Sequence, residues 1–281
     1  MALVTLEEVL KVHDGAVGAF STYDLFTLQG IIGAAEQTGL PVIAMIGAPI
    51  LNKPGNDDIG EMMVSLAKRS SAKVCIFLDH SKDYATCLKA IRLGFSAVMI
   101  DGSYLSLEEN IALTNKVAET AHSLGVSVEA EVGALAGLED GEEVKSAKMA
   151  KPEHVAQFLT GAKVEALAVS IGNAHGLYKG EPKLDFDLLQ KINQIASVPL
   201  VLHGGTGLTQ KQFATGVKFG IKKINIGTEV RRTYIEAFHK THQMDVDSWD
   251  MATMSQAGKI AVNGMVKENL QFFAETWKEF Y

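Results

Sequence analysis

The chain has 281 residues and a mass of 30.2 kDa, a length typical of one large α/β barrel. Its 47% hydrophobic and 21% charged residues exclude a disordered or fibrous protein, and its net charge of −7 disfavours general nucleic-acid binding. No apolar stretch reaches the roughly 18 residues of a membrane span, and the first residues lack the basic segment of a secretory signal, so we expect a cytoplasmic protein.

Short apolar runs alternate with amphipathic helical patterns along most of the chain. The expected strands, in chain order, cover residues 16–20, 41–46, 73–78, 96–101, 127–132, 165–171, 199–204 and 223–227. Helical patterns separate them, for example at 28–39 and at 152–162, where Pro152 is tolerated in a first helical turn. Eight such units predict a (β/α)8 (TIM) barrel, one domain over residues 1–281, with a C-terminal helical tail from about residue 229.

A doubly wound open sheet has the same alternation of strands and helices. Two observations favour the barrel. Polar residues follow many different strands, whereas an open sheet gathers its site at one switch point, and no glycine-rich nucleotide motif follows the first strand.

Three histidines lie where the chain leaves an apolar strand: His80 in LDHS, His175 in GNAHG and His203 in VLHGG. Catalytic zinc usually takes three protein ligands and keeps one position open, and imidazole is its most common neutral ligand. The histidines therefore predict a metal centre. Asp79 lies beside the first of them, and Asp101, after the fourth strand, is placed to accept a hydrogen bond from a ligand histidine.

Glycine-rich turns follow the last two expected strands: HGGTG at 203–207 and NIGT at 225–228. Barrels often bind phosphate here, through backbone amides and a helix N-terminus. The turns therefore predict a phosphate site. Its candidate donors are Thr206, Thr228, Asn225, the amide of Gly176 and, as a cation, Lys179.

An acidic stretch, VEAEVGALAGLEDGEE, leaves the fifth expected strand and enters a segment punctuated by glycine. Glu131 ends the strand and is predicted to point at the site. Glu139 and Asp140 are predicted to lie on a mobile lid over it.

Taken together, six segments resemble the metal-dependent (class II) fructose-bisphosphate and tagatose-bisphosphate aldolases: LDHS, MIDGS, VEAEVGALAGLEDG, GNAHGLYKGEPKLDF, VLHGGTG and NIGT. They lie between residue 15 and about residue 230. The resemblance implies a (β/α)8 barrel with one Zn²⁺ per subunit on the three histidines, and a monovalent cation as a further candidate ion. It also implies a homodimer or homotetramer that acts on a small sugar phosphate.

The resemblance assigns roles to other side chains as well. Asp79 would be the acid/base at the hydroxyl of the bond to be broken, and Glu139 would exchange a proton with the dihydroxyacetone phosphate carbon. Glu131 would be a nearby or alternate metal ligand. Phosphate and substrate contacts would come from Gly176, Lys179, Gly204, Gly205, Thr206, Asn225, Gly227 and Thr228.

Some positions depart from the family. Ser21 stands where the family commonly has Asn, Gly227 where fructose-bisphosphate enzymes often have Asp, and Asp247, in DVDSW at 245–249, where an arginine usually reaches the second phosphate. A carboxylate in place of that arginine should repel a second phosphate. We therefore predict a ketose 1-phosphate whose far end is neutral, deoxygenated or another anion such as a sulfonate. The candidate far-end contacts are Ser21, Lys53, Arg231 and Arg232.

Other functions fit part of the same pattern. One is a fructose- or tagatose-1,6-bisphosphate aldolase proper, and another is a metal-dependent sugar-phosphate isomerase or epimerase, which would use the same metal, phosphate site and acid/base pair. A non-catalytic sugar-phosphate binder would not need Asp79, Glu139 and all three histidines.

Overall fold

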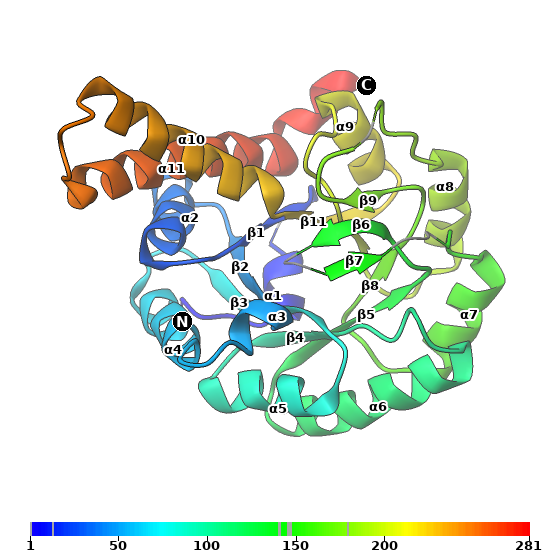
Figure 1. The fold of residues 1–281 in the computed structure, drawn as a ribbon. Helices are drawn as coiled ribbons and strands as arrows, with labels where there is room; N and C mark the ends of the chain where they lie inside the picture. Colours follow the sequence, from blue (N-terminus) through cyan, green and yellow to red (C-terminus); the bar gives the residue numbers. More distant parts are fainter. Residues whose placement is uncertain (1, 13, 140–141, 145–147, 179) are drawn as a thin grey trace.

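Eight parallel strands close into a barrel in the structure, a computed structural model that describes residues 2–12, 14–139, 142–144, 148–178 and 180–281 (Figure 1). The order of strands around the barrel is β1-β11-β10-β8-β5-β4-β3-β2, which confirms the predicted (β/α)8 barrel and excludes the open sheet. The barrel strands are β1 (Val17–Ser21), β2 (Val42–Gly47), β3 (Val74–Ser81), β4 (Ala97–Ile100), β5 (Ser127–Val132), β8 (Ala166–Val169), β10 (Leu200–Leu202) and β11 (Ile221–Ile226).

Successive strand residues face opposite sides of the barrel wall, as the alternation of strand side chains requires. Ile43 and Met45 of β2 pack inside the barrel, whereas Val42 and Ala44 pack outward in the larger core beneath the helices. Both faces are apolar because helices cover the outer one, which explains the continuous hydrophobic strand segments in the sequence.

Helices ring the barrel in Figure 1 and cover its outer face. These outer helices are α2 (Leu25–Thr38), α4 (Asp57–Arg69), α5 (Tyr84–Leu93), α6 (Leu107–Ser123), α7 (Pro152–Gly161), α8 (Phe186–Ile195) and α9 (Gln210–Lys218), with a short α3 (Ala48–Leu51) after β2. Their ends follow local signals. Asp24 accepts a hydrogen bond from the Thr27 amide at the start of α2, and Gly39 ends it with φ of 69°.

The amino-terminal end of the barrel is closed by α1 (Leu6–Leu10), a helix that the sequence analysis did not predict. Its Leu6 and Val9 are fully buried with the interior side chains of the strands. The Glu7 amide donates to Ser127 Oγ (3.3 Å) at the start of β5. The opposite, carboxyl-terminal mouth therefore stays available for a site.

The predicted C-terminal tail consists of α10 (Thr228–Met244), α11 (Met251–Ala274) and a 3₁₀ turn, η1 (Thr276–Phe280). The first two form a hairpin that packs on α2 and extends away from the barrel to the upper left of Figure 1. No helix within the described ranges is long and apolar enough to cross a membrane.

A second, three-stranded sheet lies beside the barrel mouth. It consists of β6 (Ala136–Glu139), β7 (Glu142–Val144) and β9 (Ala174–His175), in the order β7-β6-β9. The acidic segment, in which we predicted a mobile lid, therefore contains two antiparallel strands, β6 and β7. The close pairing of β6 with β9 depends on Gly137, which has φ of 124°. A Cβ at this position would lie 2.2 Å from the carbonyl oxygen of His175.

Candidate active site

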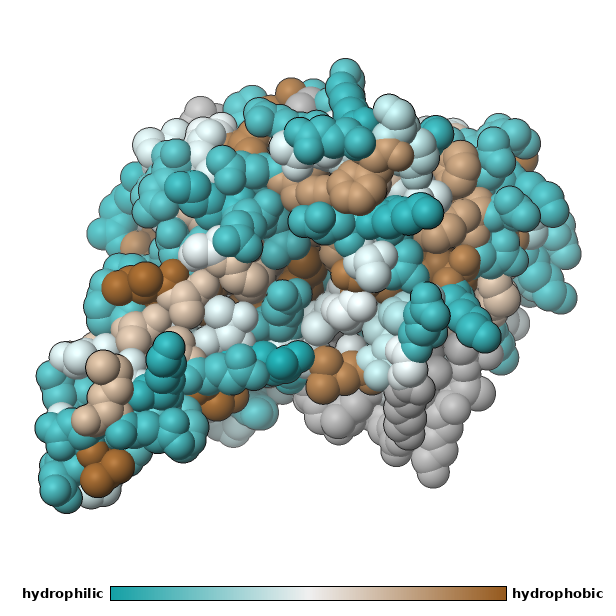
Figure 2. Space-filling model, turned by 90° about the horizontal axis from the view of Figure 1, so that it is seen from above, coloured by the Kyte–Doolittle hydropathy of each residue, from teal (hydrophilic) through white to brown (hydrophobic). Residues whose placement is uncertain are grey.

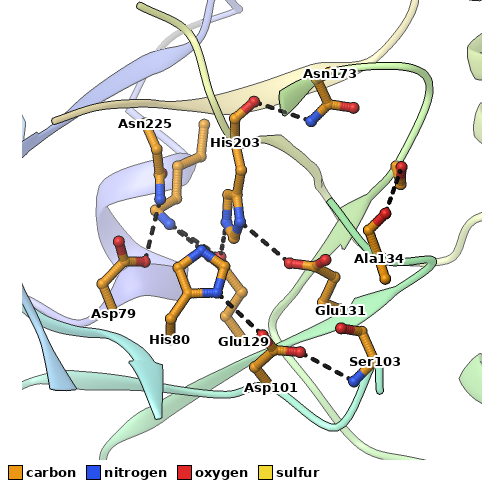
Figure 3. Close-up of polar contacts among 12 residues, drawn as sticks. Asp79, His80, Asp101, Ser103, Glu129, Glu131, Ala134, Asn173, His203 and Asn225 are labelled. Carbon is orange, nitrogen blue, oxygen red and sulfur yellow. Dashed lines mark hydrogen bonds and ion pairs between the residues drawn. The ribbon is translucent and has the colours of Figure 1, made fainter. Parts of the chain in front are cut away.

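The end of β3 brings two adjacent polar side chains to the mouth. We expected the strand to end at residue 78, but it continues to Ser81. Its register against β4 shifts between Leu78 and Ser81, and His80 has φ of 47°, a left-handed conformation that few residues other than glycine adopt. This irregularity turns Asp79 and His80 into the same space, as Figure 3 shows, although neighbours on a regular strand would point apart.

The three histidines meet at this mouth. The ring centroids of His80 lie 4.8 Å from His175 and 4.6 Å from His203, and those of His175 and His203 lie 6.3 Å apart. One nitrogen from each ring lies within 4.8 Å of the others, a spacing that suits three ligands of one metal ion. His80, Asp101 and Glu131 form an overlapping group of the same kind.

Asp101 orients His80. Its Oδ2 lies 3.2 Å from Nδ1 of His80, and its Oδ1 accepts a hydrogen bond from the Ser103 amide (3.0 Å). Burial opposes the charged form, but the hydrogen bond to His80 and the charge of that ring lower the pKa of Asp101 below its usual range. The contact at Nδ1 makes Nε2 of His80 the candidate ligand atom.

His203 is oriented by a second carboxylate, Glu129, that the sequence analysis did not identify. Nε2 of His203 lies 2.9 Å from Oε1 of Glu129, and Nδ1 lies 3.3 Å from Oε2 of Glu131 (Figure 3). Burial lowers the pKa of His203, yet these two carboxylates raise it to about 9. Nδ1 of His203 and the Glu131 carboxylate thus face each other, and both are groups that bind zinc. These residues fit a zinc ion.

Glu129 is itself held by Lys223, which the sequence analysis also missed. Nζ of Lys223 lies 2.9 Å from Oε2 of Glu129 and 4.0 Å from the centroid of the Phe77 ring. Burial raises the pKa of Glu129, but the charge of Lys223 and the bond to His203 hold it below its usual value. A signal existed in the sequence, because Glu129 and Lys223 are charged residues within two expected buried strands, where each charge needs a partner.

Asp79 is held by Asn225. The Asn225 side-chain amide donates to Oδ1 of Asp79 (3.2 Å), and both side chains are buried. We expected Asn225 to contact phosphate; in the structure, which contains no phosphate group to test this, its amide bonds to the candidate acid/base. Asp79 remains one of the residues lining the cavity described below.

The glycine turns lie on the β10–β11 side of the mouth. Gly204, with φ of 65°, packs so closely that a Cβ would lie 2.1 Å from the Ala174 carbonyl oxygen. The Gly205 amide donates to the Asn225 carbonyl (3.0 Å), so it is already bonded, and Thr206 Oγ1 accepts from the Glu229 amide (3.2 Å). Gly176 also has positive φ, of 80°.

Thr228 is the first residue of α10, and Gly227, at the N-cap, gives no side-chain cap. The N-terminus of this 17-residue helix is therefore suited to an anion, although its Glu229 amide already donates to Thr206. Lys179 and Asp140 lie outside the described residues, as does the side chain of Glu139, whose backbone belongs to β6.

The candidate far-end residues separate into two groups. Ser21 is buried at the end of β1, and a Cβ added to Gly227 would lie 2.8 Å from the Oγ of Ser21. The guanidinium of Arg231 lies 5.3 Å from the ring centroid of Tyr23. Lys53 is exposed in the turn after α3, and Arg232 is exposed and paired with Glu236 at 3.3 Å.

Asp247 lies at the exposed outer turn of the α10–α11 hairpin, which Figure 1 places far from the barrel mouth. None of the described residues that line the cavity comes from this turn. Asp247 therefore lies away from the candidate site of its own chain, whereas the family's arginine is expected to reach the second phosphate there.

A cavity of about 400 Å³ lies next to the histidines, within the size range of small-molecule sites. The ends of β2, β3, β4 and β5 line it, together with Leu135, Gly137 and His175. Asp79, Asp101 and Glu131 give it three carboxylates, and burial together with the charge of Asp101 raises the pKa of Glu131. The mouth thus holds a candidate metal site, a candidate base and space for a small ligand.

Comparison with known proteins supports this arrangement. The family described as Fructose-bisphosphate aldolase class-II matches residues 4–278. A sulfofructosephosphate aldolase from Alkalicoccus urumqiensis is 38% identical over 95% of this chain and 94% of that protein. A 6-phospho-5-dehydro-2-deoxy-D-gluconate aldolase from Halalkalibacterium halodurans is 35% identical over 99% of this chain and 98% of that protein. The crystal structure of the YdjI aldolase from Escherichia coli K12 is similar with a TM-score of 0.84 and 28% identity, over 96% of this chain and 97% of that one.

Proposed function

Because this chain belongs to the class-II fructose-bisphosphate aldolase family, and is therefore a carbon–carbon lyase, we propose that it cleaves a ketose 1-phosphate reversibly to dihydroxyacetone phosphate and an aldehyde. The observation that carries the proposal is the meeting of His80, His175 and His203 around one point, with Asp79 beside them.

One Zn²⁺ per subunit would be held by the three histidines, with Glu131 as a nearby or alternate ligand. Bound there, it would supply a Lewis acid for the carbonyl of the substrate. The approach of Glu131 to Nδ1 of His203 and the carboxylate bonded to each of two ligand rings support this assignment.

Asp79 would take the proton from the hydroxyl at the bond that breaks. It is suited to this role because Asn225 holds one of its oxygens while the carboxylate lines the cavity. Glu139 would exchange a proton with the carbon of dihydroxyacetone phosphate. Its backbone lies in β6, and Gly137 of the same strand pairs with His175, which supports this role.

The substrate phosphate would bind at the turns after β9, β10 and β11 and at the N-terminus of α10. Its contacts would include Gly176, Lys179, Gly204, Thr206 and Thr228, with Gly205 and Gly227 shaping the turns. Fixed backbone amides would hold the phosphate and thereby orient the reacting carbon.

The far end of the substrate would lack the usual second phosphate. Ser21 and Arg231 lie near Gly227, beside the phosphate turns, whereas Lys53 and Arg232 are exposed. The names of two relatives denote a sulfo-sugar phosphate and a phospho-sugar acid, which supports a far-end group other than phosphate.

The test is release of dihydroxyacetone phosphate, followed with a coupled reductase assay. We expect ketose 1-phosphates to be cleaved with a higher kcat/KM than fructose 1,6-bisphosphate, and Asp79→Asn to lower kcat by ~10²-fold or more. A strong preference for the bisphosphate would favour the fructose-bisphosphate aldolase proper. Isomerised product without bond cleavage would favour the isomerase.

We also propose a homodimer or homotetramer. Figure 2 shows hydrophobic patches among hydrophilic side chains on the part of the molecule that projects. The α10–α11 hairpin exposes several large apolar side chains: Ile235, Met244, Val246, Trp249, Met251 and Ile260. Apolar groups on a projecting element are typical of an interface between subunits. Light scattering on the purified chain would measure its mass, and a monomer would contradict this proposal.

A further inference from the structure

Lys82 gives the cavity beside the histidines its positive charge. Among the described residues that line this cavity it is the one lysine or arginine, and it shares the space with three carboxylates. It lies between the end of β3 at Ser81 and the N-cap of α5 at Asp83. Its backbone is held there, because Ser81 Oγ donates to the Asp83 carbonyl (3.0 Å) and Tyr104 OH donates to the Lys82 carbonyl (3.4 Å).

The cavity and the phosphate turns occupy opposite halves of the barrel mouth. The turns follow β10 and β11, whereas the cavity is lined from β2, β3, β4 and β5. In the closed order of strands these two groups lie on different sides, with the histidines between them. A substrate with its phosphate at the turns would therefore extend its other end into the cavity.

Charge decides which far-end groups this cavity accepts. Asp79, Asp101 and Glu131 would repel an anion there, and a neutral hydroxyl would need no cation. A lysine ammonium offers a compact charge and three donors, which suit the oxygens of a sulfonate or a carboxylate. The side chains of Ser103 and Tyr104 line the same cavity as further polar groups.

We propose that Lys82 is a specificity-determining residue that binds an anionic oxygen group, such as a sulfonate, at the end of the substrate remote from the phosphate. The proposal rests on the proposed function, since it assumes a ketose 1-phosphate placed between the turns and the cavity. It differs from the contacts expected from sequence, because Lys82 was not among the candidate far-end residues.

The experiment compares two ketohexose 1-phosphates that differ only at carbon 6, one with a sulfonate and one with a hydroxyl. We expect the unsubstituted protein to prefer the sulfonate. Lys82→Met and Lys82→Gln should each lower the ratio of the two kcat/KM values by at least ~10-fold, mainly through KM of the sulfonate, because a charge-assisted contact is lost. Lys82→Arg should keep most of the preference.

The matched control is Lys68→Met, which removes the same charge from the exposed end of α4 outside the cavity and should leave the ratio unchanged. Melting temperature and zinc content check that each variant is folded and loaded. An unchanged ratio in both neutral variants, or a preference of the unsubstituted protein for the hydroxyl, would overturn the role of Lys82 alone. Failure to release dihydroxyacetone phosphate from either sugar would overturn the proposed function and this role with it.

Discussion

Lys223 and Glu129 form an ion pair inside the barrel, beneath the mouth, with Nζ and Oε2 2.9 Å apart and both side chains fully buried. The other oxygen of Glu129 bonds to His203, so the pair connects the barrel interior to a candidate metal ligand. An isolated buried charge is costly, and each member of the pair therefore depends on the other.

Replacing Lys223 with Met should strongly destabilise the protein, because it leaves the Glu129 carboxylate buried without its cation. We expect a loss of about 3 kcal/mol or more, seen as a lower melting temperature, and partial recovery in the double variant Lys223→Met/Glu129→Gln. Full additivity of the two substitutions would show that the ion pair contributes no coupling.

Replacing Glu129 with Gln should weaken zinc binding, because a neutral amide orients and polarises the His203 ring less than a carboxylate does. We expect the affinity to fall by about 10- to 100-fold, measured by competition with a chromogenic chelator. Glu165→Gln is the matched control, since Glu165 also contacts a histidine, His122 at 3.1 Å, but away from the metal site. An equal loss in both variants would contradict a specific role for Glu129.

The barrel was predictable because its strands are buried on both faces, and so the eight apolar segments, such as 41–46, appear directly in the sequence. The polar site was only partly predictable. His80 and Asp79 stand next to each other in the chain, but their joint approach depends on a register shift and a positive φ that no residue pattern indicates. Lys223 and Glu129 are 94 residues apart, and their contact follows only from the closure of the barrel.

The role of Asn225 illustrates the same limit. Its place in a glycine-rich turn predicts phosphate binding, but nothing in this motif indicates the contact with Asp79 that the side chain makes in the barrel, where β11 lies beside β1. Register within the barrel, rather than the local motif, decides which neighbour the amide contacts.

Removal of zinc should abolish activity and lower stability together. A ligand that binds only the folded chain stabilises it by about 2.7 kcal/mol at 100 times its dissociation constant, so EDTA should lower the melting temperature and added Zn²⁺ should restore it. Activity and melting temperature measured on the same samples check this expectation. Full activity after exhaustive chelation would refute the metal role of the three histidines.

The two cysteines should be unreactive in the folded protein. Burial raises the pKa of Cys75 and of Cys87 to about 12, so both remain thiols at pH 8, where a thiolate would be the reactive form. A chromogenic disulfide reagent should react with both thiols only after denaturation. Above about pH 9 the unfolded chain loses these protons while the folded chain keeps them, so stability should fall as the pH rises further. Rapid labelling of the native protein at pH 8 would contradict the burial.

Asn225→Ala separates two roles for this side chain. If its amide positions Asp79, as the 3.2 Å contact indicates, the substitution should lower kcat by roughly 10- to 100-fold and leave KM nearly unchanged, since the base is misplaced while the substrate still binds. If the amide instead binds phosphate, KM should rise with little change in kcat.

Thr228→Ala, at the start of α10, provides the comparison, because loss of a phosphate contact there should raise KM. A change confined to KM would assign Asn225 to the phosphate site and leave Asp79 to be held by other groups.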